Sequence, residues 1–244
     1  MSVTIKTVTT KTELKSFVRF ANKLYKDNKY YVPCMPFDDM NTLSKETNAA
    51  FEFCEAELYL AYKDDRIVGR VAAIVNRKAN AAWKVDQVRF GWFDFIDDIE
   101  VSSALLDAVV AFGKARGMKQ IVGPLGFTDF DPEGMLVEGF DRLSTMALIY
   151  NHPYYPEHLK KLGYYKETGW VEYRITLPEE MPEKPAGIRE VRLHPDGCAP
   201  HAGRLGHEPA VRLRLAADPG GADPPGSAGS GLRHHHLQPD HQIP

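Results

Sequence analysis

The stretch from Glu100 to Gly117, EVSSALLDAVVAFGKARG, decides the fold of this chain. Its apolar residues recur at helical spacing, which predicts a helix that packs one face on a sheet; they are Val101, Ala104, Leu105, Ala108, Val109 and Phe112. Gly117 is expected to end the helix, because glycine readily adopts the left-handed turn that follows many helices. The turn before the helix, Asp97 to Glu100, is acidic, so its charge has the wrong sign for a phosphate ligand.

The residues before this helix predict strands. Val88 to Ile96 is apolar on both faces, which is typical of a central strand. Glu57 to Lys63 and Arg66 to Val75 are rich in β-forming residues and are joined at Asp64-Asp65, which predicts a hairpin. A short strand at Val3 to Thr7 precedes them, followed by an amphipathic helix capped by Thr10 or Thr12.

The residues after the helix continue this alternation. Lys119 to Gly123 is predicted to be a strand and Tyr155 to Leu162 a short helix, with closing strands at Tyr164 to Lys166 and Trp170 to Leu177. The long connection between Gly123 and His152 carries apolar stretches. A loop of that length is uncommon unless it is functional or flexible, so we expect a packed insertion that is either an acceptor-site wall or a structural cover.

Several motifs in this order resemble the GNAT (Gcn5-related N-acetyltransferase) superfamily, and more closely a group of bacterial GNAT-like proteins. They are YVPCMPFDD (Tyr31 to Asp39), AELYLAYKDDRIVGRVAAIVNR (Ala56 to Arg77), RFGWFDFI with SALLDAVVAFGKARGM, GMLVEGFD (Gly134 to Asp141) and YNHPYYPEHLKKLGYYK (Tyr150 to Lys166). The resemblance, from about Val3 to Leu177, implies an α/β fold with a mixed central sheet flanked by helices in residues 1–183. It also implies acyl transfer from acetyl-CoA or another acyl-CoA to an amine.

The resemblance implies a site for CoA at the start of the helix. In GNAT enzymes the preceding loop reads Gln/Arg-x-x-Gly-x-Gly/Ala, and its main-chain N–H groups hold the CoA pyrophosphate. Here Asp97 and Glu100 replace the Gln/Arg and the first glycine, and Ser102 is a mild replacement. The implied contacts of CoA are Phe95, Ile96, Asp97, Val101, Ser102 and Ser103.

The acidic turn has a second interpretation. A carboxylate about 5 Å from a phosphate charge costs about 1 kcal/mol in bulk water and several at an effective dielectric near 20. As a structural feature, Asp97 or Asp98 caps the helix, and acids in its first turn complement the helix dipole. We favour this structural role for Asp98 and Glu100, so CoA binding would need compensation from elsewhere.

Two residues are candidates for the chemistry. Asp94 interrupts an apolar strand on which GNAT enzymes often keep a carboxylate, which could deprotonate an amine. The tyrosine that protonates the leaving thiolate in many of these enzymes corresponds to Leu159 here, and Tyr155, one helical turn earlier, is the candidate substitute. A buried structural Asp94 and a Tyr155 that only packs on the fold are the alternatives. His152 could also act near neutral pH.

Composition excludes several classes of function. The net charge of −3 gives no electrostatic footprint for nucleic acid. Cys34, Cys54 and Cys198 lack metal-ligand spacing, and with no apparent signal peptide they indicate a reducing, cytoplasmic setting. No apolar run approaches the roughly 20 residues that span a bilayer. We expect a small-molecule amine as acceptor, no metal, no nucleic acid and no membrane, and a homodimer is one candidate assembly.

The last sixty or so residues differ from the rest in composition. Every aromatic residue lies at or before Tyr173, and no lysine follows Lys184. The segment 184–244 is rich in Gly, Pro, Ala, Arg and His, so it has little apolar surface to offset its ordering entropy, and we expect disorder. The change in residue usage suggests a shifted reading frame or a truncated end. We expect no metal at His234 to His236 and His241, because no folded scaffold is apparent.

Three functions stay open at the level of sequence. The first is N-acyl transfer with Asp94 as base and Tyr155 as acid. The second is a non-catalytic GNAT fold that binds a ligand or a partner domain, which the altered phosphate loop and the altered tyrosine position both favour. The third is a nonfunctional fragment of a larger enzyme, suggested by the unusual tail.

Overall fold

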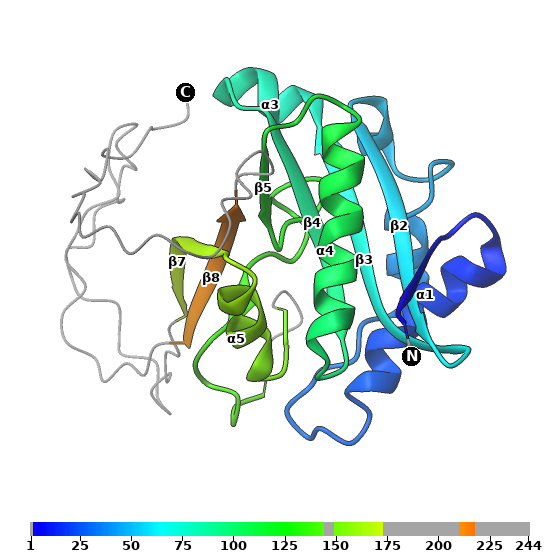
Figure 1. Cartoon of the computed structure of the whole chain (residues 1–244), viewed down its shortest axis with the longest axis vertical. Coiled ribbons are helices and arrows are strands. Elements are labelled where there is room, and N and C mark those ends of the chain that lie inside the picture. The colour runs from blue at the N-terminus through cyan, green and yellow to red at the C-terminus, as the bar shows by residue number, and fades with distance from the viewer. Residues whose placement is uncertain (1, 144–148, 173–209, 218–244) are drawn as a thin grey trace, which may run out of the picture.

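The computed structural model describes residues 2–143, 149–172 and 210–217, which form a mixed sheet with helices on both faces (Figure 1). The strands are β1 (Thr4–Thr7), β2 (Cys54–Lys63), β3 (Arg66–Asn76), β4 (Gln87–Phe95), β5 (Gln120–Gly123), β6 (Met135–Leu136), β7 (Tyr165–Glu172) and β8 (Ala210–Ala217). The helices are α1 (Lys11–Leu24), α2 (Pro36–Thr42), the 3₁₀ helix η1 (Ala49–Glu52), α3 (Arg77–Trp83), α4 (Ile99–Lys114) and α5 (Tyr154–Lys161).

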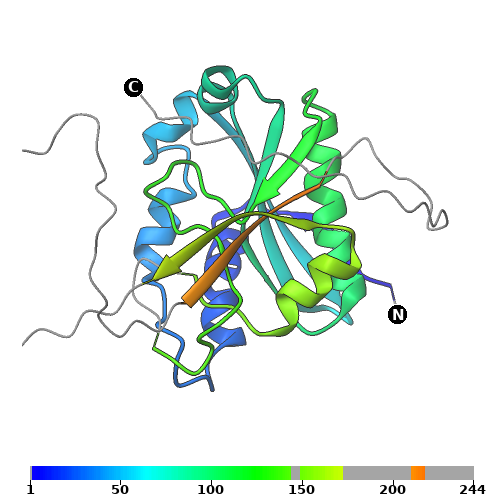
Figure 2. The ribbon, with the colours of Figure 1, turned by 90° about the vertical axis from the view of Figure 1, so that its left-hand side faces the viewer.

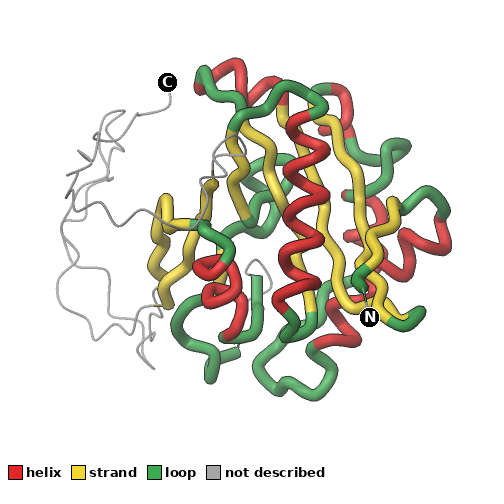
Figure 3. Tube along the Cα trace, viewed as in Figure 1, coloured by secondary structure: helices red, strands yellow, loops and turns green. Residues whose placement is uncertain are grey.

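The sheet combines antiparallel and parallel pairing. Its order is β1-β2-β3-β4-β5-β8-β6, with β7 paired to β8. Strands β1 to β4 pair in antiparallel fashion, whereas β4 and β5 are parallel. Helix α4 lies on one face and α1 on the other, as the turned view in Figure 2 and the helices in Figure 3 show. The predicted fold class, a mixed central sheet flanked by helices, is confirmed.

Strand β3 carries the core on both faces of the sheet. Val71, Ala73 and Val75 belong to the cluster that includes the buried residues of α4, and Ala72 and Ile74 belong to the cluster that includes those of α1. This assignment follows from the two-residue period of a strand. Helix α4 approaches β3 closely at Gly69, where an added Cβ would lie 2.8 Å from the Leu105 side chain.

Several boundaries of helices and strands agree with the capping and turn residues that the sequence analysis identified. Thr10 caps α1 in a capping box with Glu13, and Asp64 and Asp65 have φ of 52° and 58°, as a tight hairpin turn between β2 and β3 requires. Gly117 has the predicted left-handed conformation, with φ of 78°, although α4 ends three residues earlier, at Lys114. Helices α2, η1 and α3 were missed because each is too short to show a helical period. Strand β7 is continuous where two short closing strands were predicted.

The structure differs from the expectation for the C-terminal segment at β8. Residues Ala210–Ala217 pair with β5, β6 and β7 in antiparallel fashion. The signal was present as AVRLRLAA, in which apolar and basic residues alternate with the period of a strand. The remaining residues of the predicted tail, with the proposed boundary at 183, Cys198 and the four histidines, lie outside the described residues.

The connection between β5 and α5 is packed, as expected from its apolar stretches. Its strand β6 pairs with β8, and Asn151, just before α5, binds the N–H and the C=O of Leu136 at 2.7 and 3.0 Å. Met135, Leu136 and Tyr150 are buried. The insertion therefore belongs to the folded body of the molecule over the part that the structure describes.

Candidate functional site

Asp94 lies in a buried ion pair near the end of β4. Its Oδ2 atom accepts a hydrogen bond from Nε of Arg70, on the neighbouring strand β3, at 2.8 Å, and lies 2.7 Å from Nη2 of the same guanidinium. Only 6% of Asp94 and 4% of Arg70 is exposed. The guanidinium also donates to the carbonyl groups of Phe17 and Val18 in α1, at 2.9 and 3.2 Å. Arg70 thus joins α1, β3 and β4, and it supplies the counter-charge of Asp94.

The two predicted catalytic side chains meet through Tyr25, the residue that caps the C-terminus of α1. The Tyr25 hydroxyl donates to Oδ1 of Asp94 at 2.9 Å, and it lies 2.7 Å from the Tyr155 hydroxyl. Burial raises the pKa of both tyrosines, and the nearby negative charge of Asp94 raises it further. Since Tyr25 gives its proton to Asp94, Tyr155 is the donor between the two hydroxyls. The three groups form one hydrogen-bonded chain.

Phe95, a predicted CoA contact, lies where β4 leaves its parallel neighbour. Phe95 pairs with Gly69 of β3 on one side, but β4 and β5 pair only from Gln87 to Arg89, so on the other side none of the described strands lies beside Phe95. Its N–H donates to the Tyr155 hydroxyl at 2.9 Å, and its C=O accepts from the Tyr154 hydroxyl at 2.6 Å. Both main-chain groups that an amide-bearing ligand could use are therefore occupied by hydroxyl groups of α5.

The acidic turn caps α4. Oδ1 of Asp98 accepts from the N–H of Glu100 at 3.0 Å, and Oδ2 accepts from Nζ of Lys63 at 2.7 Å. The same ammonium lies 3.4 Å from Glu100. The hydrogen bond from Lys63 lowers the pKa of Asp98. The structural interpretation of Asp98 is confirmed, and Lys63 supplies a basic side chain beside the turn that the sequence analysis did not identify.

Asp97 and Ser102, two more predicted CoA contacts, are joined through α5. Oδ1 of Asp97 lies 2.9 Å from Nε2 of His158, and Nδ1 of His158 lies 3.0 Å from Oγ of Ser102. The Ser102 hydroxyl also donates to the carbonyl of Ile99 at 3.1 Å. Ser102 and His158 are buried, so this bridge attaches α5 to the first turn of α4 and turns Ser102 away from solvent.

The predicted CoA contacts thus separate into two groups. Phe95, Val101 and Ser102 are buried, whereas Ile96 and Ser103 are partly exposed and Asp97 is exposed. Ile96 and Asp97 lie in the turn that leads into α4, and Ser103 lies in the second turn of the helix. A ligand can therefore reach Ile96, Asp97 and Ser103. The space beside Phe95 and Ser102 is occupied by side chains of α5.

His152 lies beside the hydrogen-bonded chain. Its ring centroid is 4.8 Å from that of Tyr25 and 5.3 Å from that of Tyr154, with the latter pair stacked. The imidazole is half-buried, and this burial lowers its pKa. Burial thus favours the neutral imidazole, which is the form that can accept a proton.

A bulge in β4 precedes Asp94. Asp94 pairs with Arg70 and Gly91 with Ala72, so two residues of β4, Trp92 and Phe93, lie opposite one residue of β3. Trp92 has φ of 44°, a left-handed conformation that is uncommon for a bulky residue. Bulges often redirect side chains next to functional sites. This one brings Asp94 into register with Arg70.

Sequence reasoning missed several residues of this cluster: Tyr25, Arg70, Trp92, Tyr154 and His158. A signal for Arg70 was present, because it interrupts the apolar run of β3 just as Asp94 interrupts that of β4. Charged residues in adjacent buried strands are expected to pair. Tyr25 gave no such signal, since its spacing on the apolar face of α1 is that of an ordinary core residue.

Two classes of feature are absent from the described residues. Over the parts that the structure describes, no group of three His, Cys, Asp or Glu side chains could hold a metal ion. None of the helices among them is long and apolar enough to cross a membrane.

Comparisons with known proteins give two curated relatives. Protein YghO of Escherichia coli (strain K12) is 31% identical over 162 residues, which cover 66% of this chain and 41% of YghO. A bacterial ceramide synthase of Caulobacter vibrioides (strain NA1000 / CB15N) is 26% identical over 178 residues, which cover 72% of this chain and 46% of that protein. The chain therefore spans less than half the length of these relatives. No family model matches it.

Solved structures similar to this chain include GNAT proteins. A tandem GNAT protein from the clavulanic acid biosynthesis pathway gives a TM-score of 0.48 at 8% identity, covering 70% of this chain and 47% of that one. A probable acetyltransferase from Staphylococcus epidermidis ATCC 12228 gives 0.45 at 12% identity, covering 88% and 98%. The hairpin β2–β3, the central strand β4, the helix α4 that follows it and the strand β5 occur in the order that the motifs predicted, and over these elements the chain has a GNAT-like fold.

Proposed function

We propose that this chain is an acyltransferase that moves an acyl group from acyl-CoA to an amine. The observation that carries the proposal is the hydrogen-bonded chain Asp94–Tyr25–Tyr155, which connects a carboxylate to a phenol at the unpaired edge of β4. Asp94 is the proposed base and Tyr155 the proposed acid. A base and an acid joined by one hydroxyl can restore each other's protonation state after every turnover.

The proposed reaction needs one proton at each end of this chain. The amine nitrogen attacks the thioester carbonyl, the C–S bond breaks, and Asp94 takes the proton that the nitrogen loses. Tyr155 gives its proton to the departing thiolate. Tyr25 then passes the proton from Asp94 back to Tyr155, because its hydroxyl contacts both groups.

One relative supports an amine as the acceptor. It is named a bacterial ceramide synthase, and a ceramide is an amide of a long-chain amino alcohol. For this chain an amino alcohol or another amine is thus the proposed acceptor class. The proposed position of the CoA phosphates is the surface formed by Ile96 and Asp97, in the turn before α4, and by Ser103 in the helix. Lys63 is the nearby cation. The homodimer and the cytoplasmic location stay predictions.

The second candidate function is a non-catalytic GNAT-like module. It is favoured by the occupied main-chain groups of Phe95 and by the His158 bridge over α4. An acyl-CoA molecule lying along β4 has to displace the Tyr154 hydroxyl from the carbonyl of Phe95. Replacing Tyr154 with phenylalanine should therefore strengthen CoA binding if the ligand uses this edge, and leave it unchanged if it does not.

Thiol release tests the enzymatic proposal. Wild type is assayed with acetyl-CoA and a long-chain acyl-CoA against a panel of amines that includes amino alcohols. Asp94→Asn and Tyr155→Phe should each lower turnover by about 10²- to 10⁴-fold and leave CoA affinity, measured by calorimetry, nearly unchanged. Asp86→Asn is the matched control, because Asp86 is an exposed carboxylate paired with Lys119, and it should keep wild-type turnover.

The assay also decides between the two candidates. Asp94→Asn leaves the buried guanidinium of Arg70 without its counter-charge, so turnover is compared at a temperature at which circular dichroism shows the variant to be folded. Wild-type binding of CoA without turnover on any amine, together with a loss of stability alone in Asp94→Asn, would assign Asp94 a structural role and favour the binding module.

A further inference from the structure

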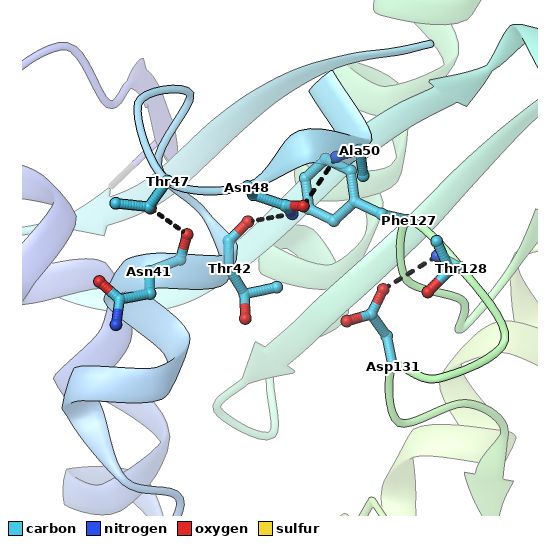
Figure 4. Close-up of a pocket in the computed structure, with 8 residues that line it drawn as sticks. All are labelled: Asn41, Thr42, Thr47, Asn48, Ala50, Phe127, Thr128 and Asp131. Atoms are coloured by element: carbon cyan, nitrogen blue, oxygen red, sulfur yellow. Dashed lines mark hydrogen bonds between the residues drawn. The ribbon is translucent and has the colours of Figure 1, made fainter. Parts of the chain in front are cut away.

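A pocket of about 230 Å³ opens between the end of α2 and the connection that follows β5. Figure 4 shows its two walls, with Asn41, Thr42 and Asn48 on one side and Thr128 and Asp131 on the other. Water occupies about 30 Å³ per molecule in the liquid. The pocket therefore has room for a ligand of a few non-hydrogen atoms.

The wall from the connection after β5 is held rigidly. The carbonyl of Phe127 accepts hydrogen bonds from Nδ2 of Asn76 at 2.8 Å and from Nη1 of Arg89 at 3.2 Å, and both donors are buried. The ring of Phe127 packs on that of Phe51, 4.9 Å between centroids. A binding wall fixed in this way needs little ordering when a ligand arrives.

Asp131 is a partly buried carboxylate in this wall. Its Oδ2 atom accepts from the N–H of Thr128 at 2.9 Å, and Figure 4 shows its other oxygen turned toward the opposite wall. Among the described residues no side-chain nitrogen of Lys, Arg or His lies within 4 Å of it. Burial raises its pKa, an effect that the hydrogen bond from the main-chain N–H of Thr128 and, less strongly, the charge of Arg89 partly offset. A carboxylate that is partly removed from water gains from a cationic partner.

The opposite wall offers further polar groups. The Asn48 side chain is already used, since its Nδ2 donates to the carbonyl of Thr42 at 2.7 Å and its Oδ1 accepts from the N–H of Ala50 at 2.9 Å. The hydroxyl of Thr42 and the side-chain amide of Asn41 form no hydrogen bond within the described part of the chain. They can accept from or donate to a ligand hydroxyl.

We propose that this pocket binds a small amino alcohol, with its ammonium group on Asp131 and its hydroxyl on Thr42 and Asn41. Asp94 and Tyr155 do not line this pocket, so its proposed role is to hold the amine acceptor before the nitrogen reaches Asp94, and that role rests on the proposed function. The connection to Asp94 runs through Trp92, two residues earlier on β4. The ring of Trp92 lies 6.0 Å from that of Phe127, and its Nε1 donates to Asp39 of α2 at 3.3 Å.

Titration of the full chain with ethanolamine at pH 7 tests the site. In amide-resolved NMR the resonances of Thr128 and Ala50 should shift and saturate, because these N–H groups lie in the two walls. Glycolate, which has the same size and the opposite charge, should leave them unchanged. Asp131→Asn should weaken ethanolamine binding by about tenfold or more, since a hydrogen bond to a charged group contributes roughly 1.5–3 kcal/mol.

Two further variants make the result specific. Asp129→Asn removes an exposed carboxylate from the same loop and should leave binding unchanged, whereas Thr42→Val should weaken it severalfold. Equal affinity in wild type and Asp131→Asn, or equal shifts with glycolate, would overturn the proposal. Saturable binding without any acyl transfer would support the pocket and overturn the acyltransferase proposal. Acyl transfer without binding of ethanolamine in this pocket would support the acyltransferase proposal and overturn the pocket.

Discussion

Asp94 and the acids of the turn from Asp97 to Glu100 are neighbours in sequence, but they lie in different environments. Asp94 is buried and is held by Arg70 and Tyr25. Asp97 is exposed and contacts His158, whereas Asp98 caps α4 and forms an ion pair with Lys63. The side chains of Arg70, Tyr25, His158 and Lys63 are all distant from the acids in sequence, whereas the cap of α4 by Asp98 is local. The contrast teaches that the burial and side-chain partners of a carboxylate here are set by elements distant in the chain, and four experiments measure how strong that contrast is.

Removing Arg70 should have the largest effect. Arg70→Met leaves the Asp94 carboxylate buried without a counter-charge, and breaking a buried pair in this way typically costs about 3–5 kcal/mol. Chemical denaturation measures the loss in unfolding free energy. Arg66→Met is the matched control, because Arg66 is exposed on the same strand and should change stability by no more than about 0.5 kcal/mol. Equal losses of unfolding free energy in the two variants would show that the buried ion pair contributes no more to stability than an exposed arginine.

Removing the Tyr25 hydroxyl should have the next largest effect. Tyr25→Phe keeps the ring but leaves Oδ1 of Asp94 and the Tyr155 hydroxyl without their shared partner, which costs about 1–3 kcal/mol for unsatisfied buried groups. If the three groups relay a proton, turnover falls as well. Tyr30→Phe is the control, since the structure records no hydrogen bond of the Tyr30 hydroxyl among the described residues. Unchanged stability would show that water replaces the hydroxyl.

The cap of α4 should contribute less than the buried pair. Asp98→Ala should cost about 1 kcal/mol, the usual value of an N-cap, and Asp98→Asn should cost less because asparagine caps equally well. The hydrogen bond from Lys63 depresses the folded pKa of Asp98. Its stabilising effect is therefore present above the unfolded pKa of about 3.9 and is lost as pH falls through the folded value. A difference between wild type and Asp98→Ala that grows on acidification would contradict this.

The smallest expected effect concerns CoA itself. Neutralising Asp97 and Glu100 together should strengthen CoA binding by about tenfold or less at low salt, and by less as salt screens the charges. Calorimetry at two ionic strengths measures it. Neutralising the exposed Asp129 and Glu138 instead gives the same change in net charge and controls for long-range effects. Unchanged affinity at both ionic strengths would mean that the turn serves only to cap α4.

The sequence by itself determined the layers of the fold and its central elements. The apolar period of α4, the two-faced apolar run of β4 and the Asp64-Asp65 turn each predicted the element that is observed. These signals are local, because they depend on side-chain period and on the backbone preferences of a few residues. The long connection after β5 was also recognised as packed from its apolar stretches. The alternation in AVRLRLAA carried the signal for β8 but was outweighed by the composition around it.

The caps formed by Thr10 and Asp98 were predicted from sequence, but only the tertiary structure decided the partners of the buried polar residues. Asp94 and Tyr155 were singled out by position in a strand and a helix, but Tyr25, which joins them, comes from the end of α1, and Arg70, the counter-charge of Asp94, comes from β3. His158 was unremarkable in sequence, yet it bridges Asp97 and Ser102. The pocket at Asp131 combines α2 with the connection after β5. Period and composition record burial, whereas hydrogen-bond partners depend on which distant elements fold together, and a single sequence does not encode that pairing in any local pattern.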